Sequence, residues 1–319
     1  MVHSVLPRPL TRAESKLLDA SAVISADRAT ASEAAYVARQ LIQATLPHKN
    51  PGNLPLWTRT NGDTTLGIQP GFNLKTGKSY GYPYGTVPRL LIYWMTTESL
   101  RTKSPRLELG HSLAEFMAEL GLNPDNGSAG AKRSDAKRLR DQMTRLFNAV
   151  MSFQGDLEHE GEEGVARINM TVARKTVLWW SPRQPEQGSL WGSYVELGQD
   201  FYGAITAAPV PVDIRALKAL KRSPLALDLY AWLTYEAYRA HKSRKSRFEN
   251  WTQLHAHLGA EYARPSDFRR YAKVALRKIV TVYPGLKLGK KRGGIEVMPD
   301  SLTALHPRQA PLQKIRKTL

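Results

Sequence analysis

The sequence contains no cysteine in 319 residues, which excludes a disulfide framework, a thiolate nucleophile and a cysteine-based zinc site. Acidic residues are few, with 28 Asp and Glu against 46 Lys and Arg, so the formal net charge is +18. No apolar run reaches the roughly 18 residues that would predict a membrane helix, and the first residues lack the layout of a signal peptide. We therefore expect a cytoplasmic protein whose partner is a polyanion, nucleic acid rather than a membrane.

The most informative feature that is present is an internal repeat. The aligned pairs are residues 94–101 (WMTTESLR) with 232–239 (WLTYEAYR), Ser112–Gly121 with Asn250–Gly259, and Ser134–Leu139 with Ser266–Tyr271. The first two pairs share one offset of 138 positions, and a loop six residues longer in the first copy precedes the third pair. A repeat of this length indicates one supersecondary unit used twice.

Each copy is predicted to begin with two helices. The first carries apolar residues at helical spacing, namely Leu90, Leu91, Trp94 and Met95 in copy one and Leu225, Leu229, Trp232 and Leu233 in copy two. The second begins at an N-cap residue, Ser112 or Asn250, and ends at Gly121 or Gly259.

A third helix and a β-ribbon complete each copy. The helix starts at Ser134 or Ser266, and its predicted core residues are Leu139, Met143, Leu146 and Phe147 in copy one and Tyr271, Val274 and Ile279 in copy two. The ribbon is predicted at Val165–Val172 in copy one and as a hairpin over Leu286–Val297 in copy two. Three helices followed by a ribbon describe a winged helix, so the sequence predicts an α+β fold with two tandem winged-helix domains.

The remaining segments fit around these units. We expect a flexible segment at 1–28, a first domain at 29–208, a second domain at 209–300 and a basic, mobile tail at 301–319. Within the first domain the pattern predicts a helix at Ala31–Leu46, a hairpin at Leu56–Ile68 with an Asn61-Gly62 turn, and a strand at Ser189–Leu197. Residues 209–212 are expected to be a linker, and Asp213–Leu220 a short helix. Trp57 and Leu66 of the hairpin are expected to be exposed and to form a dimer surface.

Positive charge is concentrated in copy two. Residues 239–292 contain 15 Lys and Arg against 3 Asp and Glu, whereas residues 101–153 contain 9 against 6. Candidate nucleic-acid-binding residues lie before the second helix, on the third helix and at the wing in copy two, and at the corresponding places in copy one. They are Lys242, Arg244, Lys245, Arg247, Ser266, Arg269, Arg270, Lys273, Arg277, Lys290, Lys291 and Arg292, and Lys132, Arg133, Lys137, Arg138, Arg140, Arg174 and Lys175. Copy two should therefore supply most of the electrostatic affinity.

Five segments in this order resemble those of a known family: Pro83–Leu91, Leu107–Gly121, Val195–Tyr202, Pro209–Leu217 and Ser223–Leu233. The chain resembles the plasmid-encoded RepA-type replication initiators over roughly Ala31–Asp300. The resemblance implies tandem winged helices that bind repeated duplex sites (iterons) in a plasmid origin and promote melting of an adjacent AT-rich region. It also implies recruitment of the host replication initiator and the replicative helicase, and a homodimer that represses its own gene.

Three motifs suggest other chemistry. His255-Ala-His257 resembles the metal-binding pair of a rolling-circle nickase, with Tyr262 or Tyr271 as nucleophile, but the repeat places both histidines within a helix, where residues two apart diverge. Gly71–Ser79 has five residues between its glycines where a phosphate loop has four. The acidic run Asp156–Glu163 is expected to be a solvated loop at the tip of the first wing.

No nucleophile and base come together in these patterns, so we expect a binding protein without cofactor or metal and not an enzyme. The mechanism is then physical: each third helix enters a major groove and the basic clusters contact phosphates. Two linked units would cover about 20 base pairs, because successive major grooves lie about 34 Å apart. A winged-helix transcription repressor without an initiation role remains the alternative.

Overall fold

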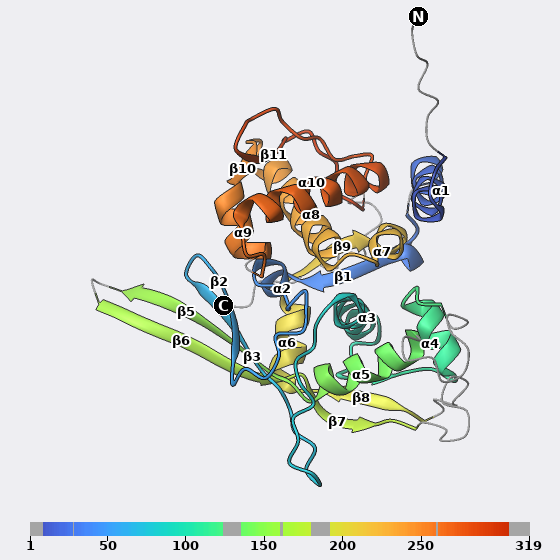
Figure 1. Ribbon diagram of the computed structural model, residues 1–319, viewed down its shortest axis with the longest axis vertical. Coiled ribbons are helices and arrows are strands. Elements are labelled where there is room, and N and C mark those ends of the chain that lie inside the picture. The colour runs from blue at the N-terminus through green and yellow to red at the C-terminus, as the bar shows by residue number, and fades with distance from the viewer. Residues whose placement is uncertain are drawn as a thin grey trace, which may run out of the picture.

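The computed structural model describes residues 9–27, 29–123, 135–159, 162–179, 192–259 and 261–305. Helices and strands are mixed along the chain, which confirms the α+β class. Figure 1 shows the second repeat lying above the first, with strands β1 and β9 between them.

The internal repeat appears in the structure as two sets of three helices. They are α3 (Thr86–Thr102), α4 (Leu113–Glu119) and α5 (Asp135–Phe147) in the first repeat, and α8 (Pro224–Ser243), α9 (Trp251–Gly259) and α10 (Pro265–Val282) in the second. The apolar stripes predicted for α3, α5 and α8 are buried. Both predicted N-caps of the second helix are confirmed, because Ser112 accepts from the Glu115 N–H at 3.2 Å and Asn250 from the Gln253 N–H at 2.9 Å.

A small antiparallel sheet completes each repeat. In the second repeat β10 (Arg247–Asn250) pairs with β11 (Gly294–Val297), and the Gly289 N–H donates to the Glu296 carbonyl at 2.9 Å, which closes the predicted hairpin. In the first repeat β8 (Tyr194–Leu197) pairs with β4 (Arg106–Glu108) on one side and β7 (Ala173–Val177) on the other. In both repeats, therefore, the strand between the first and second helices pairs with the last strand of the unit.

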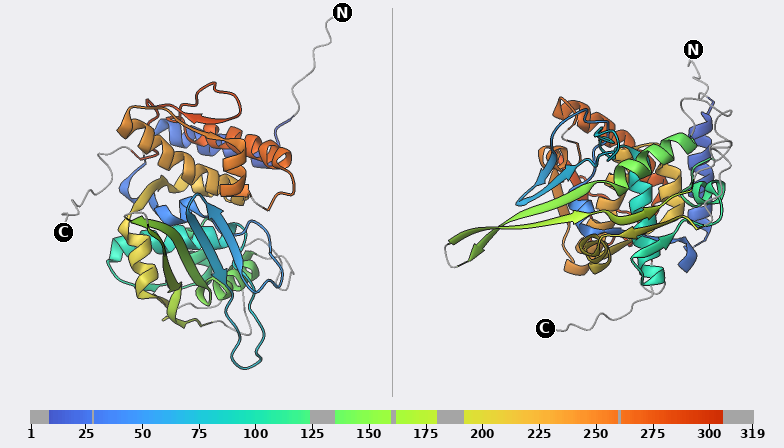
Figure 2. Two further views of the ribbon diagram at one scale, coloured as in Figure 1. Left: turned by 90° about the vertical axis from the view of Figure 1, so that its left-hand side faces the viewer. Right: turned by 90° about the horizontal axis from the view of Figure 1, so that it is seen from below.

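The ribbon predicted after the third helix of the first repeat was assigned to the wrong strand. Val165–Val172 lies largely in β6 (Glu162–Thr171), but β6 pairs with β5 (Val150–His159) in a separate sheet of order β2-β3-β5-β6. The counterpart of the second repeat's hairpin is β7–β8, and the β5–β6 hairpin is an insertion that projects from the body (Figures 1 and 2). The acidic run lies toward the end of this insertion, not at the β7–β8 turn, and its side chains lie outside the described part of the chain. Alternation within a strand does not encode which strand it pairs with, so the sequence could not predict that β6 pairs with β5 and not with β8.

The four-stranded sheet also contains the predicted hairpin, β2 (Trp57–Asn61) and β3 (Thr64–Gln69). However, Trp57 is only 7% exposed and Leu66 is fully buried, so the expectation that these two residues form a dimer surface is wrong. Alternate side chains of the hairpin face the core, and both residues belong to that face.

A strand also interrupts the helix expected at Ala31–Leu46. Residues 34–38 form β1 (Ala34–Ala38), which pairs antiparallel with β9 (Pro209–Asp213), and only α2 (Arg39–Gln43) is helical beyond a short 3-10 turn at Ala31–Glu33. Residues 209–212 are thus a strand rather than a linker, and the pairing crosses the expected domain boundary. The prolines in β9 favour an extended backbone, and pairing between distant segments overrides local helix propensity. Helices α6 (Gln199–Ala207) and α7 (Ile214–Leu220) flank β9, and α7 was predicted.

Both chain ends contain ordered contacts where mobile segments were expected. Residues 12–26 form α1 (Arg12–Ala26), whose capping box joins Thr11 and Glu14. The Ser21 hydroxyl donates to the Thr281 carbonyl at 2.6 Å and ties α1 to the end of α10. At the other end Ser301 donates to the Lys287 carbonyl at 3.0 Å, and residues 306–319 lie outside the described chain.

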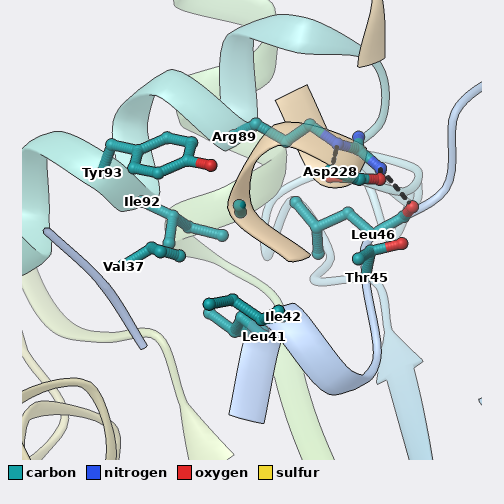
Figure 3. A pocket seen from close by; sticks show the side chains of 10 residues that line it. Val37, Leu41, Ile42, Thr45, Leu46, Arg89, Ile92, Tyr93 and Asp228 are labelled. Atoms are coloured by element: carbon teal, nitrogen blue, oxygen red, sulfur yellow. Dashed lines mark hydrogen bonds and ion pairs between the residues drawn. The ribbon is translucent and has the colours of Figure 1, made fainter. Parts of the chain in front are cut away.

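A buried ion pair joins the two repeats. The Nε and Nη2 atoms of Arg89, in α3, donate to the two carboxylate oxygens of Asp228, in α8, both at 2.7 Å (Figure 3). The remaining N–H groups of Arg89 donate to the carbonyl oxygens of Leu46, Pro47 and Gly85 at 2.6–3.0 Å. A bidentate pair with satisfied surroundings fixes the two helices relative to each other.

His48, Glu261 and Arg59 extend this junction. His48 Nε2 lies 2.8 Å from the Asp228 carboxylate. Glu261, in the turn before α10, accepts from the His48 backbone N–H and from Arg59 Nη2, both at 2.7 Å. Burial alone would raise the pKa of Asp228, but the Arg89 guanidinium and the His48 hydrogen bond outweigh it and hold the pKa well below its usual range. The carboxylate therefore stays ionised and the junction is charged on both sides.

We expect Asp228→Ala to lower the free energy of unfolding by about 3–5 kcal/mol, because it leaves Arg89 buried without its counter-charge. Urea unfolding at neutral pH measures this. A carboxylate with a depressed folded-state pKa stabilises above its unfolded value of about 3.9, so the difference between wild type and variant should shrink as the pH falls below 4. Asp300→Ala removes an exposed partner of Lys287 and serves as the control with an unchanged midpoint. Equal midpoints for the two variants would contradict the structural role of the pair.

Candidate nucleic-acid interface

Helix α10 separates its apolar and basic residues onto opposite faces. Its core face consists of Phe268, Ala272, Ala275, Ile279 and Val282, at steps of four and three residues. The opposite face carries Ser266, Arg270, Lys273 and Arg277, all exposed and at the same steps. The helix begins at Pro265 after the cap residue Arg264, so Ser266 is not the N-cap that the sequence suggested.

Two residues of α10 were assigned to the wrong face. Tyr271 is 48% exposed and Val274 is 38% exposed, whereas Ile279 is buried as predicted. The misassignment arose because Phe268, Ala272 and Ala275 form a regular stripe whose small alanines do not stand out in the sequence.

The basic face of α10 is continuous with the hairpin that follows it. The Arg269 guanidinium lies 6.0 Å from the ring of Trp251, the first residue of α9. The Trp251 N–H in turn donates to the carbonyl of Gly293, in the hairpin turn, at 3.0 Å. Lys290, Lys291 and Arg292 occupy that turn and are exposed, and Lys291 lies 4.3 Å from the Phe248 ring. These contacts place the third helix, the start of the second helix and the hairpin turn on one basic surface.

The end of α8 and the segment that leads to β10 add positive charge to the second repeat. Lys242, Arg244 and Lys245 are exposed, and Arg244 ends α8 in the left-handed conformation, with φ of 54°. Arg247 is half-buried, and its Nε lies 3.1 Å from the carboxylate of Glu236. Three of the four predicted cations thus face solvent, while the charge of Arg247 is offset within the protein.

The third helix of the first repeat offers a smaller basic face. Lys137 and Arg138 are exposed, Arg140 is half-buried, and the exposed Asp141 brings negative charge to the same face. The C-terminal end of α5 is occupied: Gln142 is buried and accepts from the Tyr84 N–H at 2.9 Å, and Arg145 donates to the Tyr82 carbonyl at 3.3 Å. Lys132 and Arg133 lie outside the described residues.

The β7–β8 ribbon of the first repeat is also partly neutralised. Arg174 donates to the carboxylate of Glu196 at 2.7 Å, and Lys175 lies 5.7 Å from the Tyr194 ring. Arg174 remains 66% exposed, so its side chain still reaches solvent. Candidate arginines are paired with carboxylates in both repeats, Arg138 and Arg174 in the first and Arg247 and Arg270 in the second, so the expected difference in basic surface rests on composition.

The first turn of each third helix repeats one ion pair. Asp135 lies 3.0 Å from Arg138 in α5, and Asp267 lies 3.3 Å from Arg270 in α10. Arg138 and Arg270 therefore share one ion-pair partner by position, although Arg270 also lies 4.9 Å from the Tyr271 ring.

The motifs that suggested other chemistry have structural explanations. His257 is buried and its Nε2 lies 2.7 Å from the Ile42 carbonyl, while His255 Nε2 lies 3.0 Å from the Tyr262 carbonyl, so the two rings have separate partners. In the Gly71–Ser79 loop, the N–H groups of Lys75 and Gly77 donate to Asn73, which leaves them turned into the loop rather than toward a phosphate. Within the described residues no group of three or more His, Asp or Glu could hold a metal ion, and no helix is long and apolar enough to cross a membrane.

The chain is thus an α+β protein built from two related helix-and-ribbon units, of which the second carries the more basic surface. Residues 82–253, more than half of the chain, match the family described as plasmid encoded RepA protein (RepA_C). The chain belongs to this family of plasmid replication proteins, as the resemblance of its five segments indicated.

A solved structure is similar to this chain over most of the length of both. Domains 2 and 3 of RctB align with a TM-score of 0.47 and 11% sequence identity, covering 80% of this chain and 95% of the RctB chain. No match was found among curated protein sequences.

We expect Arg269→Ala with Arg270→Ala to weaken binding to the chain's specific duplex by at least about tenfold, since one base contact of this kind contributes about 1–3 kcal/mol. Lys137→Ala with Arg138→Ala should weaken it less, because α5 presents fewer cations and an exposed carboxylate. Fluorescence anisotropy with the two double variants in one buffer gives the comparison. A larger loss in the α5 variant would reverse the assignment of the dominant repeat.

Proposed function

We propose that this chain is a plasmid replication initiator that binds repeated duplex sites (iterons) in its origin through two winged-helix domains. The observation that carries the proposal is the exposed stripe of Ser266, Arg270, Lys273 and Arg277 on α10, with a second exposed basic cluster at the hairpin turn Lys290–Arg292. Membership of the RepA family supports the initiator role. Melting of an adjacent AT-rich region and recruitment of the host initiator and replicative helicase complete the proposed activity.

In this proposal α10 enters a major groove and the β10–β11 side of the second domain contacts phosphates. Arginine side chains donate to guanine, whereas lysines at the hairpin turn act on the backbone, which carries no sequence information. Helix α5 enters a neighbouring groove through Lys137 and Arg138. The two sites together span about 20 base pairs, because successive major grooves lie about 34 Å apart.

The junction between the repeats makes two-groove binding efficient. The Arg89–Asp228 pair holds α3 and α8 together, so docking of one domain brings the other to the duplex as an intramolecular partner. The weaker first repeat then contributes through effective concentration, while the second repeat provides most of the electrostatic attraction.

The proposed activity requires no reaction by the protein itself. We infer a binding protein that works without a cofactor or metal, in line with the separate partners of His255 and His257. A nickase would need both imidazoles turned toward one ion beside a nucleophilic tyrosine.

A homodimer is part of the proposal. Strand β6 is an edge of the four-stranded sheet, and its Val165 and Ile168 are 63% and 44% exposed. An exposed edge strand with apolar side chains favours pairing with another strand. Ile168→Lys should therefore shift the free protein toward the monomer in sedimentation velocity, and an unchanged sedimentation coefficient would remove β6 from the dimer surface.

Changing Lys290, Lys291 and Arg292 together to Ala should weaken binding to specific and scrambled duplexes about equally, since phosphates carry no sequence. The plot of log affinity against log salt should become shallower by roughly 2–3, at about 0.9 for each phosphate that the variant no longer neutralises. A salt titration of wild type and variant on both duplexes measures the slopes. Identical slopes would take the hairpin turn out of the interface.

The initiator role is tested by supplying the chain in trans to a plasmid that carries the origin but no initiator gene. Replication of that plasmid supports the proposal. Repression of the chain's own promoter without replication would instead identify a winged-helix repressor, which uses the same DNA-binding surfaces without host recruitment.

A further inference from the structure

Val274 occupies an unusual place on α10. It is 38% exposed and lies outside the core stripe, beside the basic face of the helix. On a helix, the neighbours of a residue are those three and four positions away. For Val274 these are Arg270, Tyr271, Arg277 and Lys278, all exposed, so the valine lies among three cations and one aromatic ring.

The fold gives no reason for a valine at this position. An exposed β-branched residue loses side-chain freedom in a helix and is a weaker helix former than alanine or lysine. The core of the second repeat is completed by Phe268, Ala272 and Ala275, without Val274. It remains 38% exposed until another molecule covers it.

A major groove offers one apolar feature to such a side chain. Thymine carries a C5-methyl group there, and valine-sized apolar groups can contact it, while guanine offers only acceptors to arginine. The cations around Val274 would approach phosphates and guanine edges, and the valine, beside them on the helix, would reach a neighbouring base edge.

We propose that Val274 is a specificity-determining residue that recognises the C5-methyl group of a thymine in the binding site. The proposal rests on the function proposed above, with α10 in a major groove. It assigns thymine to one position next to the bases or phosphates contacted by Arg270 and Arg277, and it makes that contact apolar rather than a hydrogen bond.

The test uses the duplex that the full-length chain enriches from a random-sequence pool. Each thymine is replaced singly by deoxyuridine, which removes only the methyl group. For the wild-type chain one replacement should weaken binding about fourfold, the factor for burying one methyl-sized group at about 0.8 kcal/mol. In Val274→Ala, binding to the thymine duplex should fall by a similar factor, and deoxyuridine at that position should have no further effect.

Val280→Ala is the matched control. Val280 is 43% exposed on the same helix, near the end that Ser21 of α1 contacts; it neighbours Arg277 but lies more than two turns from Arg270. It should retain the wild-type response to deoxyuridine at every position. Alanine is a good helix former, so both variants should fold.

The outcomes separate this proposal from the proposed function. Full deoxyuridine sensitivity in Val274→Ala at every thymine, or none in the wild type, would overturn the role of Val274 while leaving duplex binding intact. Failure to enrich any duplex would overturn the proposed function itself.

Discussion

The buried ion pair between Arg89 and Asp228 determines how the two repeats work together. Each repeat has its own three helices, and a flexible connection would let them bind independent sites. Instead, a bidentate pair with both bonds at 2.7 Å joins the first helix of one repeat to that of the other. Because both charges are buried, removing either side chain leaves the other without a counter-charge and lowers the free energy of unfolding. Together with the shared apolar core, this constraint fixes the spacing between α5 and α10, on which the proposed two-groove binding depends.

The two repeats share one arrangement of helices and strands but differ in the charge of their exposed surfaces. The Asp–Arg pair in the first turn of the third helix is present in both. In the first repeat, however, the 69–85 segment covers the end of α5 and Glu196 faces Arg174, whereas α10 exposes cations from Arg269 to Lys278. The first repeat also carries the inserted β5–β6 hairpin. Under the proposed function, the second repeat would supply most of the DNA affinity and the first a weaker DNA contact.

Sequence reasoning recovered the features that depend on local pattern. The repeat itself, the apolar stripes of α3, α5 and α8, the caps at Ser112 and Asn250, and the basic stripe of α10 all follow from residue spacing. Pairing between distant segments was not recoverable: β1 with β9, and β6 with β5 rather than with β8, depend on partners that alternation does not specify. Val274 was misplaced because a valine at helical spacing predicts a core position, while Ala272 and Ala275 carry the core instead.

The absence of cysteine allows a direct measurement of the central claim that α5 and α10 occupy successive major grooves. A single cysteine at Ser266 or at Asp141, labelled with an iron chelate, cleaves the DNA that lies closest to it. The account predicts two cleavage centres on one face of the duplex, about one helical turn or 10 base pairs apart, one for each labelled protein. Coincident centres, or no cleavage from the Ser266 position, would contradict it.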